Sequence, residues 1–453
     1  MTPLEILLTA LFILLIAGLF LFAIISFQEG HRRAARLSSL FACGLALLFT
    51  LLLLASLKLQ VIFASALGLG ILLFTVLCFL PLGKDIPPSP APHTQVDERT
   101  IMFARAQLQP GSAEFKAYYQ DHPEHLAIDN AFRDHPGLLE PGAAFYSQIL
   151  GASPQASFFL TEALRNAVDG AVADEKVSRP PAQMTTFIKD LVTYLGGLDV
   201  GICKLQPYHI YSHIGRGTGD YGAPITLDHK FAIAFTVEMA HEMINAAPHM
   251  PSVTESARQY AEASKIAVIL AAAIRAIGYP ARAHIDGNYR VIAPLVAKDA
   301  GLGEIGRMGL LMTPRLGPRV RLAVVTTNLP LIPDQPAFDP SLIDFCTICK
   351  KCAEVCPAGA LPFGDRQPYE DGTLRWKIDP ERCYTYWTQV GTDCGRCMAV
   401  CPYAHADHFL HNLIRFGVAQ SGMFRRAANA MDDFFYGKKP RPHSLPEWIS
   451  KIS

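Results

Sequence analysis

The sequence predicts a membrane anchor of three helices, followed by a mixed α/β domain that ends in a small cysteine-rich domain. Three observations support this fold class. Half of the residues are hydrophobic, and long apolar runs are concentrated at the front of the chain. Short β-branched segments alternate with helical ones in the middle, and eight of the eleven cysteines fall in two tight groups after residue 340.

The three apolar runs cover residues 6–26, 37–57 and 59–83 and contain no charged side chain. As a helix, each would span about 30 Å or more, which matches the hydrocarbon core of a bilayer. One such run could be a cleaved signal peptide. Three in succession, without a cleavage site after the first, predict a retained anchor over residues 1–83 in contact with membrane lipid.

Basic residues around the runs predict the orientation of this anchor. The first connection carries Arg32, Arg33 and Arg36, whereas the second offers only Lys58. The positive-inside rule therefore places the first loop in the cytoplasm and the N-terminus outside. We expect a multi-pass protein of the inner (cytoplasmic) membrane, with everything after residue 83 on the cytoplasmic side.

A proline-rich linker over residues 84–100 leads into the predicted α/β core, residues 101–340. The runs "VGICKLQP", "FAIAFTVEM" and "RVRLAVVTTNLPL" have the composition of buried strands. A helix is predicted from Pro251 to Gly278, with Ser252 and Glu255 as a capping box. The last segment, residues 406–453, is predicted to form amphipathic helices that pack on the core.

The charge balance argues against one class of partner. The chain has 40 basic and 40 acidic residues, so it offers no net electrostatic attraction for a phosphate backbone. We therefore expect no nucleic acid among its partners.

The two cysteine groups have the spacing of iron–sulfur ligands. The first run reads C-x2-C-x2-C-x3-C-P, and the second is a single cysteine followed by C-x2-C-x3-C-P. In two-cluster ferredoxins the last cysteine of each run binds the other cluster. Residues 341–405 are therefore predicted to hold two [4Fe–4S] clusters, one bound by Cys346, Cys349, Cys352 and Cys401, the other by Cys356, Cys383, Cys394 and Cys397. Zinc is the alternative, but it prefers two separated C-x2-C pairs.

Two glycine-rich segments upstream are candidates for binding a large polar ligand. Glycines let backbone amides approach such a ligand closely, and an arginine beside them can meet a phosphate or carboxylate. The first segment, residues 211–222, contains Tyr211, His213, Gly215, Arg216, Gly217 and Tyr221. The second, residues 299–309, contains Ala300, Gly301, Leu302, Gly303, Glu304, Gly306 and Arg307.

The second segment also matches the pattern G-x-G-x-x-G, and a helix is expected to begin inside it. A nicotinamide site is a weak alternative here, because no clean strand precedes the glycines and no ribose-binding acid follows. Either segment, taken alone, could be a simple turn.

Together these segments carry a family resemblance. The order of "SHIGRG", "VEMAHEMI", "IRAIGYPARAH", "APLVAKDAGLGEIGR" and the two cysteine sets, over roughly residues 195–405, resembles the reductive dehalogenases, which are corrinoid iron–sulfur enzymes. The chain is more distantly similar to epoxyqueuosine reductases. The resemblance implies a nitroreductase-like α/β core that holds base-off cobalamin between the glycine-rich segments. It also implies a ferredoxin-like domain whose clusters reduce the cobalt.

The resemblance also implies catalytic positions. Family members usually carry a catalytic tyrosine in the stretch that aligns with "VEMAHEMI", and this chain has His241 there. A histidine with a pKa near its reference value of about 6.5 can donate a proton, although a purely structural role stays open. Asn288, Tyr289 and Arg290 occupy the place where the family has a basic residue facing the substrate, which makes Arg290 the expected anion-stabilising group.

The leading hypothesis is an oxidoreductase, a membrane-anchored cobalamin-dependent reductase that removes halogen from a small organohalide. Alternatives are a corrinoid reductase of a non-halogenated substrate, a non-catalytic membrane-bound iron–sulfur electron carrier, and a tRNA-modifying reductase, which the charge balance and the anchor disfavour. The electron donor could be a reductase, a ferredoxin or quinol, and neither the substrate nor the oligomeric state follows from the sequence.

Overall fold

The computed structural model describes residues 3–80, 86–336 and 338–452. Contacts divide the chain into two compact units. The anchor unit comprises Met1–Ile86, Pro340–Cys349 and His405–Arg441, and the core unit comprises Pro87–Asp339, Lys350–Ala404 and Pro442–Ser453. The segment His405–Arg441 thus shares a unit with the apolar N-terminal segment.

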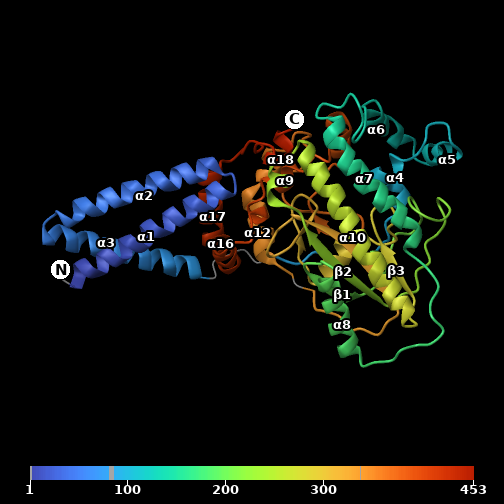
Figure 1. Ribbon diagram of the computed structural model, residues 1–453, viewed down its shortest axis with the longest axis horizontal. Coiled ribbons are helices and arrows are strands. Elements are labelled where there is room, and N and C mark those ends of the chain that lie inside the picture. The colour runs from blue at the N-terminus through green and yellow to red at the C-terminus, as the bar shows by residue number, and fades with distance from the viewer. Residues whose placement is uncertain (1–2, 81–85, 337, 453) are drawn as a thin grey trace. The chain divides into compact units, whose positions relative to one another are not determined.

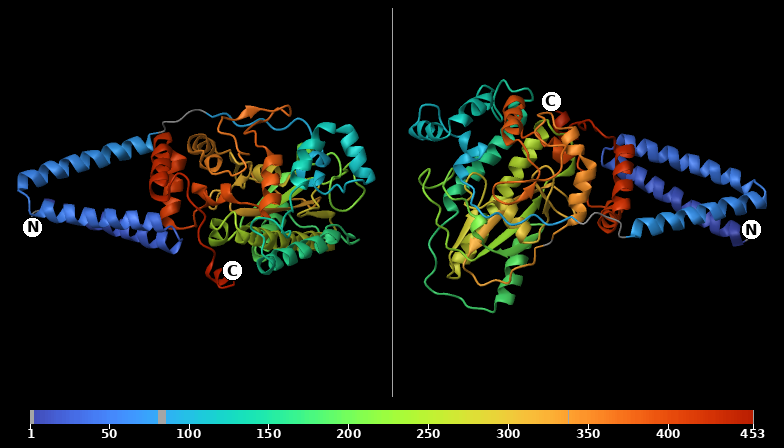
Figure 2. Two further views of the ribbon diagram at one scale, coloured as in Figure 1. Left: turned by 90° about the horizontal axis from the view of Figure 1, so that it is seen from above. Right: turned by 180° about the vertical axis from the view of Figure 1, so that it is seen from behind.

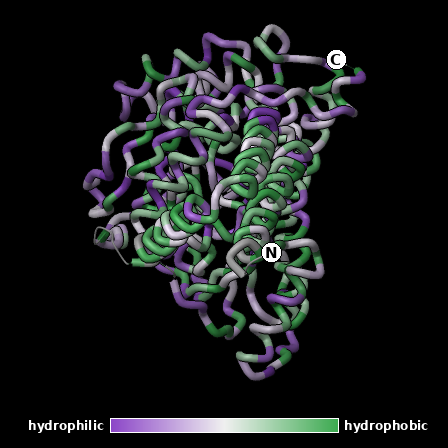
Figure 3. Tube along the Cα trace, turned by 90° about the vertical axis from the view of Figure 1, so that its left-hand side faces the viewer, coloured by the Kyte–Doolittle hydropathy of each residue, from purple (hydrophilic) through white to green (hydrophobic). Residues whose placement is uncertain are grey.

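The three apolar runs of the anchor unit are helices α1 (Pro3–Gln28), α2 (Arg32–Leu53) and α3 (Leu57–Phe79). Within them, Leu8–Gln28, Arg32–Leu53 and Leu57–Val76 are long and apolar enough to cross a membrane. Their hydrophobic character is continuous along most of each helix (Figure 3). The predicted helices are therefore present, while residues 81–83 of the third run lie outside the described part of the chain.

Three further helices complete the anchor unit: α12 (Pro340–Cys349), α16 (Phe409–Gln420) and α17 (Gly422–Tyr436). Helix α17 contacts α2 and α3, and an ion pair of 2.7 Å joins its Arg425 to Asp344 of α12. Arg33, just after the first loop, donates to the carbonyl oxygen of Phe434 at 3.1 Å. The α1–α2 loop and the C-terminal helices therefore lie at the same end of the anchor unit (Figures 1 and 2).

The core unit is built on an antiparallel sheet of four strands in the order β1-β2-β6-β3. These strands are β1 (Val200–Lys204), β2 (Phe231–Glu238), β3 (Ala281–His284) and β6 (Val320–Thr327). The register pairs Val200 with Phe235, Val237 with Arg321, and His284 with Val324. The three strands predicted from sequence are confirmed as β1, β2 and β6.

Helices cover both faces of this sheet because successive strand residues point to opposite sides. Ile233 and Phe235 pack with Ile266 and Leu270 of helix α10 (Met250–Ala276), and α8 (Pro181–Tyr194) joins the same face. Their neighbours Ala232 and Ala234 pack on the other face, against α11 (Ala293–Asp299). Figure 1 shows α10 lying along the sheet, where α7 (Gln148–Leu164) packs against it.

Helix α10 confirms the predicted helix but not its predicted cap. The N-cap residue is His249, so Ser252 lies inside the helix and its hydroxyl donates to the carbonyl oxygen of His249 at 3.1 Å. Glu255 instead accepts a hydrogen bond from the backbone N–H of Ala240 at 2.8 Å. Ser252 and Glu255 therefore do not form a capping box, because Ser252 bonds within the helix and Glu255 bonds to the segment before it.

The second glycine-rich segment does not begin a helix, which corrects that expectation. It follows α11 and continues into a hairpin of β4 (Glu304–Ile305) and β5 (Leu311–Met312). A Cβ on Gly303 would lie 2.2 Å from the carbonyl oxygen of Met312, so glycine permits this close approach. A hairpin is not the strand–turn–helix unit that holds a dinucleotide, so the nicotinamide alternative loses its basis.

The cysteine-rich domain contains a short internal repeat. Residues 349–357 read C-K-K-C-A-E-V-C-P, and residues 394–402 read C-G-R-C-M-A-V-C-P. In each copy a left-handed residue, Lys350 (φ 55°) or Gly395 (φ 67°), precedes a one-turn helix. These helices are α13 (Lys351–Glu354) and α15 (Arg396–Ala399), which pack against each other, so the two runs meet in space.

The remaining elements of the described chain are short helices, short strands and turns that connect these parts or lie at their periphery. They are α4 (Met102–Arg105), α5 (Ala113–Asp121), α6 (Pro123–Arg133), α9 (His241–Asn245), α14 (Pro380–Val390), α18 (Glu447–Ser450), the strands β7 (Gln367–Pro368) and β8 (Leu374–Arg375), and four 3₁₀ turns, η1 (Glu98–Thr100), η2 (Arg165–Ala167), η3 (Pro207–His209) and η4 (Pro402–Ala404).

Candidate active site

The first glycine-rich segment is fixed by one buried carboxylate. Glu98 accepts hydrogen bonds from the backbone N–H groups of Gly215, at 2.9 Å, and Arg216, at 3.2 Å, and from Nε of Arg216 at 3.1 Å. A Cβ on Gly215 would lie 2.7 Å from the backbone of Glu98, so only glycine fits there. The charge of Arg216 is thus balanced by Glu98 within the protein.

Two predicted catalytic side chains support the same loop. Arg290 donates to the carbonyl oxygens of Arg216, at 3.0 Å, and Thr218. Asn288 is fully buried, donates to the carbonyl oxygen of Arg165 and accepts from Arg282, both at 2.9 Å. Hydrogen bonds within the protein therefore occupy both side chains, which hold the loop in place.

The other predicted ligands in this loop have mixed environments. Burial raises the pKa of Tyr211 and of Tyr221 to about 12, so both phenols stay protonated at neutral pH. The Tyr221 hydroxyl is buried and has no hydrogen-bond partner among the described residues. His213 is more exposed, with Nδ1 3.0 Å from the Ser212 hydroxyl.

The second glycine-rich segment connects the core to the cysteine-rich domain. Arg307 donates to the carbonyl oxygens of Pro362 and Gly364, both at 2.7 Å. One oxygen of the buried Glu304 pairs with Lys298 at 2.8 Å, while the other has no partner within the described chain. Ala300 and Leu302 are buried in the core, while Gly301 and Gly306 take part in the turns around the hairpin.

A cluster that the sequence analysis found only in part, through Tyr289, lies between α10 and β6. It consists of Tyr260 on α10, Tyr289 and Asp286 on the loop after β3, and Arg321 on β6. The guanidinium of Arg321 lies 4.7 Å from the centre of the Tyr260 ring. Arg321 and Asp286 both affect the pKa of Tyr260 and that of Tyr289, which places the four side chains close together.

Burial sets the protonation of this cluster. It raises the pKa of Tyr260, although Arg321 opposes the shift, and raises that of Tyr289 well above its ordinary value. Burial opposes the charge of Arg321, but Tyr260 and Asp393 raise its pKa. Both phenols are surrounded by protein and still partly reachable by solvent. The site therefore holds two neutral phenols and one cation at neutral pH.

Arg321 connects this cluster to the cysteines. It donates to the hydroxyl of Ser256 at 2.5 Å and to a carboxylate oxygen of Asp393 at 3.1 Å. Asp393 immediately precedes Cys394. The Nε atom of Arg321 is buried without a hydrogen-bond partner in the described residues, so one donor remains for a bound molecule. The sequence carried one signal of this site, an arginine inside an otherwise apolar buried strand.

His241, the residue expected at the place of the family tyrosine, lies near the cysteine-rich domain. It begins the short helix α9, and the Asn245 side-chain nitrogen lies 3.0 Å from its Nε2. Helix α9 packs against α10 and against α15, which carries Cys397. His241 is not among the main causes of the pKa shifts of Tyr260, Tyr289 or Arg321.

The structure brings together the four cysteines predicted for the second cluster. Burial raises the pKa of Cys383 to about 11 and that of Cys394 to about 12. The pKa of Cys397 lies well above its ordinary value because of burial and then of nearby Cys394, Cys383, Cys352 and Cys356. Such crowded thiols repel each other as thiolates, and iron bound between them would remove that repulsion. This donor set therefore fits an iron–sulfur cluster.

The four cysteines predicted for the first cluster are divided between the two units. Cys346 and Cys349 lie one turn apart on α12, within the anchor unit, while Cys352 and Cys401 belong to the core unit. The assignment of these four to one cluster stays a prediction.

Comparisons with known proteins agree with the iron–sulfur interpretation. The family described as "4Fe-4S dicluster domain" matches residues 345–405. A tetrachloroethene reductive dehalogenase of Sulfurospirillum multivorans is 30% identical over 307 residues, which is 60% of this chain and 60% of that protein. An epoxyqueuosine reductase of Listeria monocytogenes is 34% identical over 131 residues, covering 25% of this chain.

A solved structure gives a similar result. The catabolic reductive dehalogenase NpRdhA, in complex with 3-bromo-4-hydroxybenzoic acid, superposes with a TM-score of 0.65 at 27% identity over 79% of this chain. The chain corresponds to 49% of that protein and 60% of the Sulfurospirillum enzyme. The predicted resemblance to reductive dehalogenases is therefore confirmed, as is the more distant one to epoxyqueuosine reductases.

Proposed function

We propose that this protein is a membrane-anchored, cobalamin-dependent oxidoreductase that removes halogen from a small organohalide, with electrons passed through two [4Fe–4S] clusters. The observation that carries the proposal is the link from Arg321 through Asp393 to Cys394. It joins a proton donor and a cation to a set of cysteines that are predicted to bind iron, all inside one compact unit.

The reaction defines what the site has to supply. Reductive dehalogenation consumes an organohalide, two electrons and one proton, and releases the hydrogenated product and a halide ion. The carbon–halogen bond breaks and a carbon–hydrogen bond forms. When bound, cobalamin supplies the cobalt that takes up the electrons and reacts with the halogenated carbon. The protein supplies the proton and a charge that stabilises the departing halide.

Tyr260 is the proton donor that the geometry supports best. Its raised pKa keeps the phenol protonated at neutral pH, as an acid needs to be before the reaction. The Arg321 guanidinium over the ring stabilises the phenolate left behind. His241 remains the alternative donor, as its alignment with the family tyrosine suggests.

Arg321 also takes the role expected of Arg290. Its Nε donor is without a partner in the described chain, whereas Arg290 is hydrogen-bonded to loop carbonyls. A halide held at Arg321 would meet a cation in a largely buried site, where such an interaction is stronger than in water. Tyr289 lies in the same cluster and fits its predicted place facing the substrate.

The groups without partners support a corrinoid in the core. The Tyr221 hydroxyl and one Glu304 oxygen are buried donors or acceptors that lack partners among the described residues. Cobalamin carries amide side chains that both donate and accept, so these atoms together with the glycine-rich segments 211–222 and 299–309 would hold it. Base-off binding follows the family resemblance.

The anchor and the relatives suggest location and substrate class. Arg32, Arg33 and Arg36 favour a cytoplasmic first loop, and the C-terminal helices lie at that same end of the anchor unit. Because one similar dehalogenase was solved with 3-bromo-4-hydroxybenzoic acid, halogenated phenols and benzoates are the first substrates to test. A membrane reductase, a ferredoxin or quinol would supply the electrons.

Metal analysis tests this proposal. Protein purified without oxygen, in detergent, should contain about one cobalt and about eight iron atoms per chain, since each cluster holds four irons. Protein that contains iron but no cobalt, even after reconstitution with cobalamin, would overturn the proposal of a corrinoid cofactor and favour an electron carrier. Zinc in place of iron would overturn the clusters.

A further inference from the structure

A second group of side chains that could bind a metal lies in the anchor unit, and it contains no cysteine. It comprises Glu29 and His31 on the α1–α2 loop, His405 just before α16, and His411 on α16. Their side chains are only 4%, 13%, 13% and 9% exposed. Burying four titratable groups is costly unless they interact with one another or with an ion.

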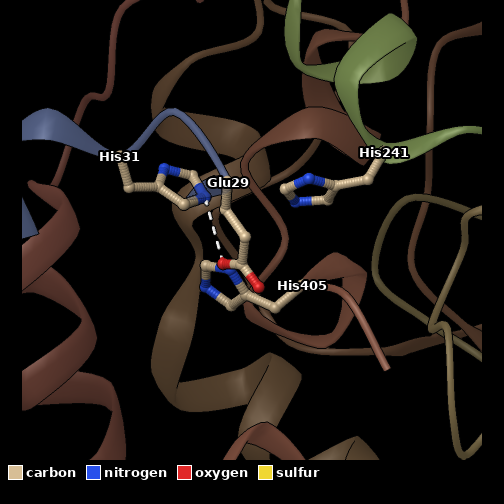
Figure 4. Close-up of side chains that lie close together, drawn as sticks. All are labelled: Glu29, His31, His241 and His405. Atoms are coloured by element: carbon tan, nitrogen blue, oxygen red, sulfur yellow. Dashed lines mark ion pairs between the residues drawn. The ribbon is translucent and has the colours of Figure 1, made fainter. Parts of the chain in front are cut away.

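Three members of the group lie close enough together to share one ion, and the fourth, His411, contacts Glu29. The His411 Nε2 atom lies 3.2 Å from each carboxylate oxygen of Glu29, and the His31 Nε2 atom lies 4.0 Å from one of them. The ligand atoms of Glu29, His31 and His405 all lie within 4.8 Å of each other. Ligands of a tetrahedral ion at about 2.0–2.1 Å are roughly 3.4 Å apart, so small side-chain movements would close the site. Figure 4 shows the Glu29 carboxylate extending toward His405, with His31 on its other side.

The surroundings of His405 add a second, independent observation. Its Nε2 atom lies 3.3 Å from a carboxylate oxygen of Asp432 on α17. Metal-binding histidines commonly use their other nitrogen in this way, which fixes the ring and strengthens it as a ligand. The Tyr436 ring lies 4.4 Å from that of His405 and 4.8 Å from that of His31. The Tyr436 ring therefore covers His405 and His31 on one side.

We propose that Glu29, His31, His405 and His411 bind one divalent transition-metal ion. Three imidazoles and one carboxylate favour zinc, and four protein ligands leave no position open, as in structural zinc sites. The ion would fasten the α1–α2 loop to the C-terminal helices of the anchor unit. His408 approaches Glu29 at 3.5 Å but is 46% exposed, so it is not one of the four ligands. The site does not depend on the proposed catalytic function.

Metal binding is measured on the full chain in detergent, purified without oxygen, equilibrated with zinc chloride and then desalted. We expect about one zinc per chain in the wild type, and loss of that zinc in Glu29→Gln and in His405→Ala. His408→Ala is the matched control, because it removes a neighbouring imidazole outside the proposed set and should keep the zinc. Iron content, measured in parallel, shows whether each variant has kept its fold.

The outcomes separate a built site from adventitious binding. Wild-type protein that retains its iron but holds no zinc would overturn the proposal, and the group would then be a set of hydrogen bonds around Glu29. Zinc retained equally by His405→Ala and the wild type would overturn it as well. If a variant loses its iron, its zinc content is not used. The wild-type zinc content and the zinc content of His411→Ala then decide the proposal.

Discussion

Most of the cysteine-rich domain, residues 350–404, belongs to the same core unit as the tyrosine–arginine site, yet the two regions are encoded in different ways. Within each C-x2-C and C-x3-C run, only two or three residues separate successive cysteines. One short turn of the chain can therefore present them together. Tyr260, Tyr289 and Arg321 come from a helix, a loop and a strand, and only the packing of α10 on the sheet brings them together. A metal site whose ligands lie close together in the sequence can be predicted from their spacing. A site whose residues are brought together only by the fold cannot be predicted in that way.

The largest effect is expected at the junction of the two regions. Cys394→Ser should cost about four of the eight irons and abolish halide release, because a serine oxygen is a poor cluster ligand. Iron analysis and halide assay check this. Cys203→Ser is the matched control, because Cys203 is buried in the core outside both cysteine runs, and it should keep all the iron.

Tyr260→Phe should lower the rate of halide release by about 10²–10⁴-fold, the usual contribution of a positioned acid. The ring and its packing remain, so cobalt and iron contents should not change. Halide release measured under saturating reductant checks the rate. A rate equal to that of the wild type would assign the proton to another group.

The pH dependence distinguishes Tyr260 from His241. Because burial raises the pKa of Tyr260 above its ordinary value of 10, donation from this phenol should leave the rate flat from pH 6 to 9. Donation from an imidazole would make the rate fall as the pH rises through about 6.5. The His241→Phe variant supplies the control, and its profile should match that of the wild type.

Arg321→Gln should reduce halide release by about 10²–10³-fold, because a neutral amide cannot stabilise the departing halide as a cation does. Arg258→Gln is the matched control, since Arg258 lies on α10 with a side chain 64% exposed. A comparable loss in the control would mean that general surface charge, rather than this site, is responsible.

The smallest effect concerns the stability of the sheet that positions the site. Burial holds the pKa of His284 well below its ordinary value, and its Nδ1 accepts a hydrogen bond from the backbone of Arg290. The unfolded chain therefore binds the proton first, and stability is lost as the pH falls below about 6.5, by about 1.4 kcal/mol at pH 5.5. In His284→Gln the thermal midpoint should vary less between pH 7.5 and 5.5. An unchanged pH dependence would contradict this assignment.

The sequence predicted the parts of the fold that depend on local patterns. Charge-free runs long enough to span a bilayer predicted α1, α2 and α3, and β-branched runs predicted β1, β2 and β6. The cap of α10 and the helix start within residues 299–309 were wrong, because tertiary contacts use Ser252 and Glu255 and because close strand pairing uses Gly303.

The candidate site was predicted unevenly for the same reason. The cysteines of the second cluster were found by spacing, and the structure brings them together. Asn288 and Arg290 were predicted to be catalytic, and in the structure their side chains donate hydrogen bonds to Thr218 and Arg216 of the first glycine-rich segment. Tyr260 stands in a long helix among small residues, so nothing in its neighbourhood marks it as a proton donor.

The central claim is that electrons entering the clusters are used to replace halogen by hydrogen. The most direct test measures halide released per electron supplied, with cobalt- and iron-replete protein, a strong reductant and a panel of halogenated phenols and benzoates. The account predicts one halide for every two electrons, with release lost when cobalamin is absent. Replete protein that takes up electrons but releases no halide from any member of the panel would contradict it.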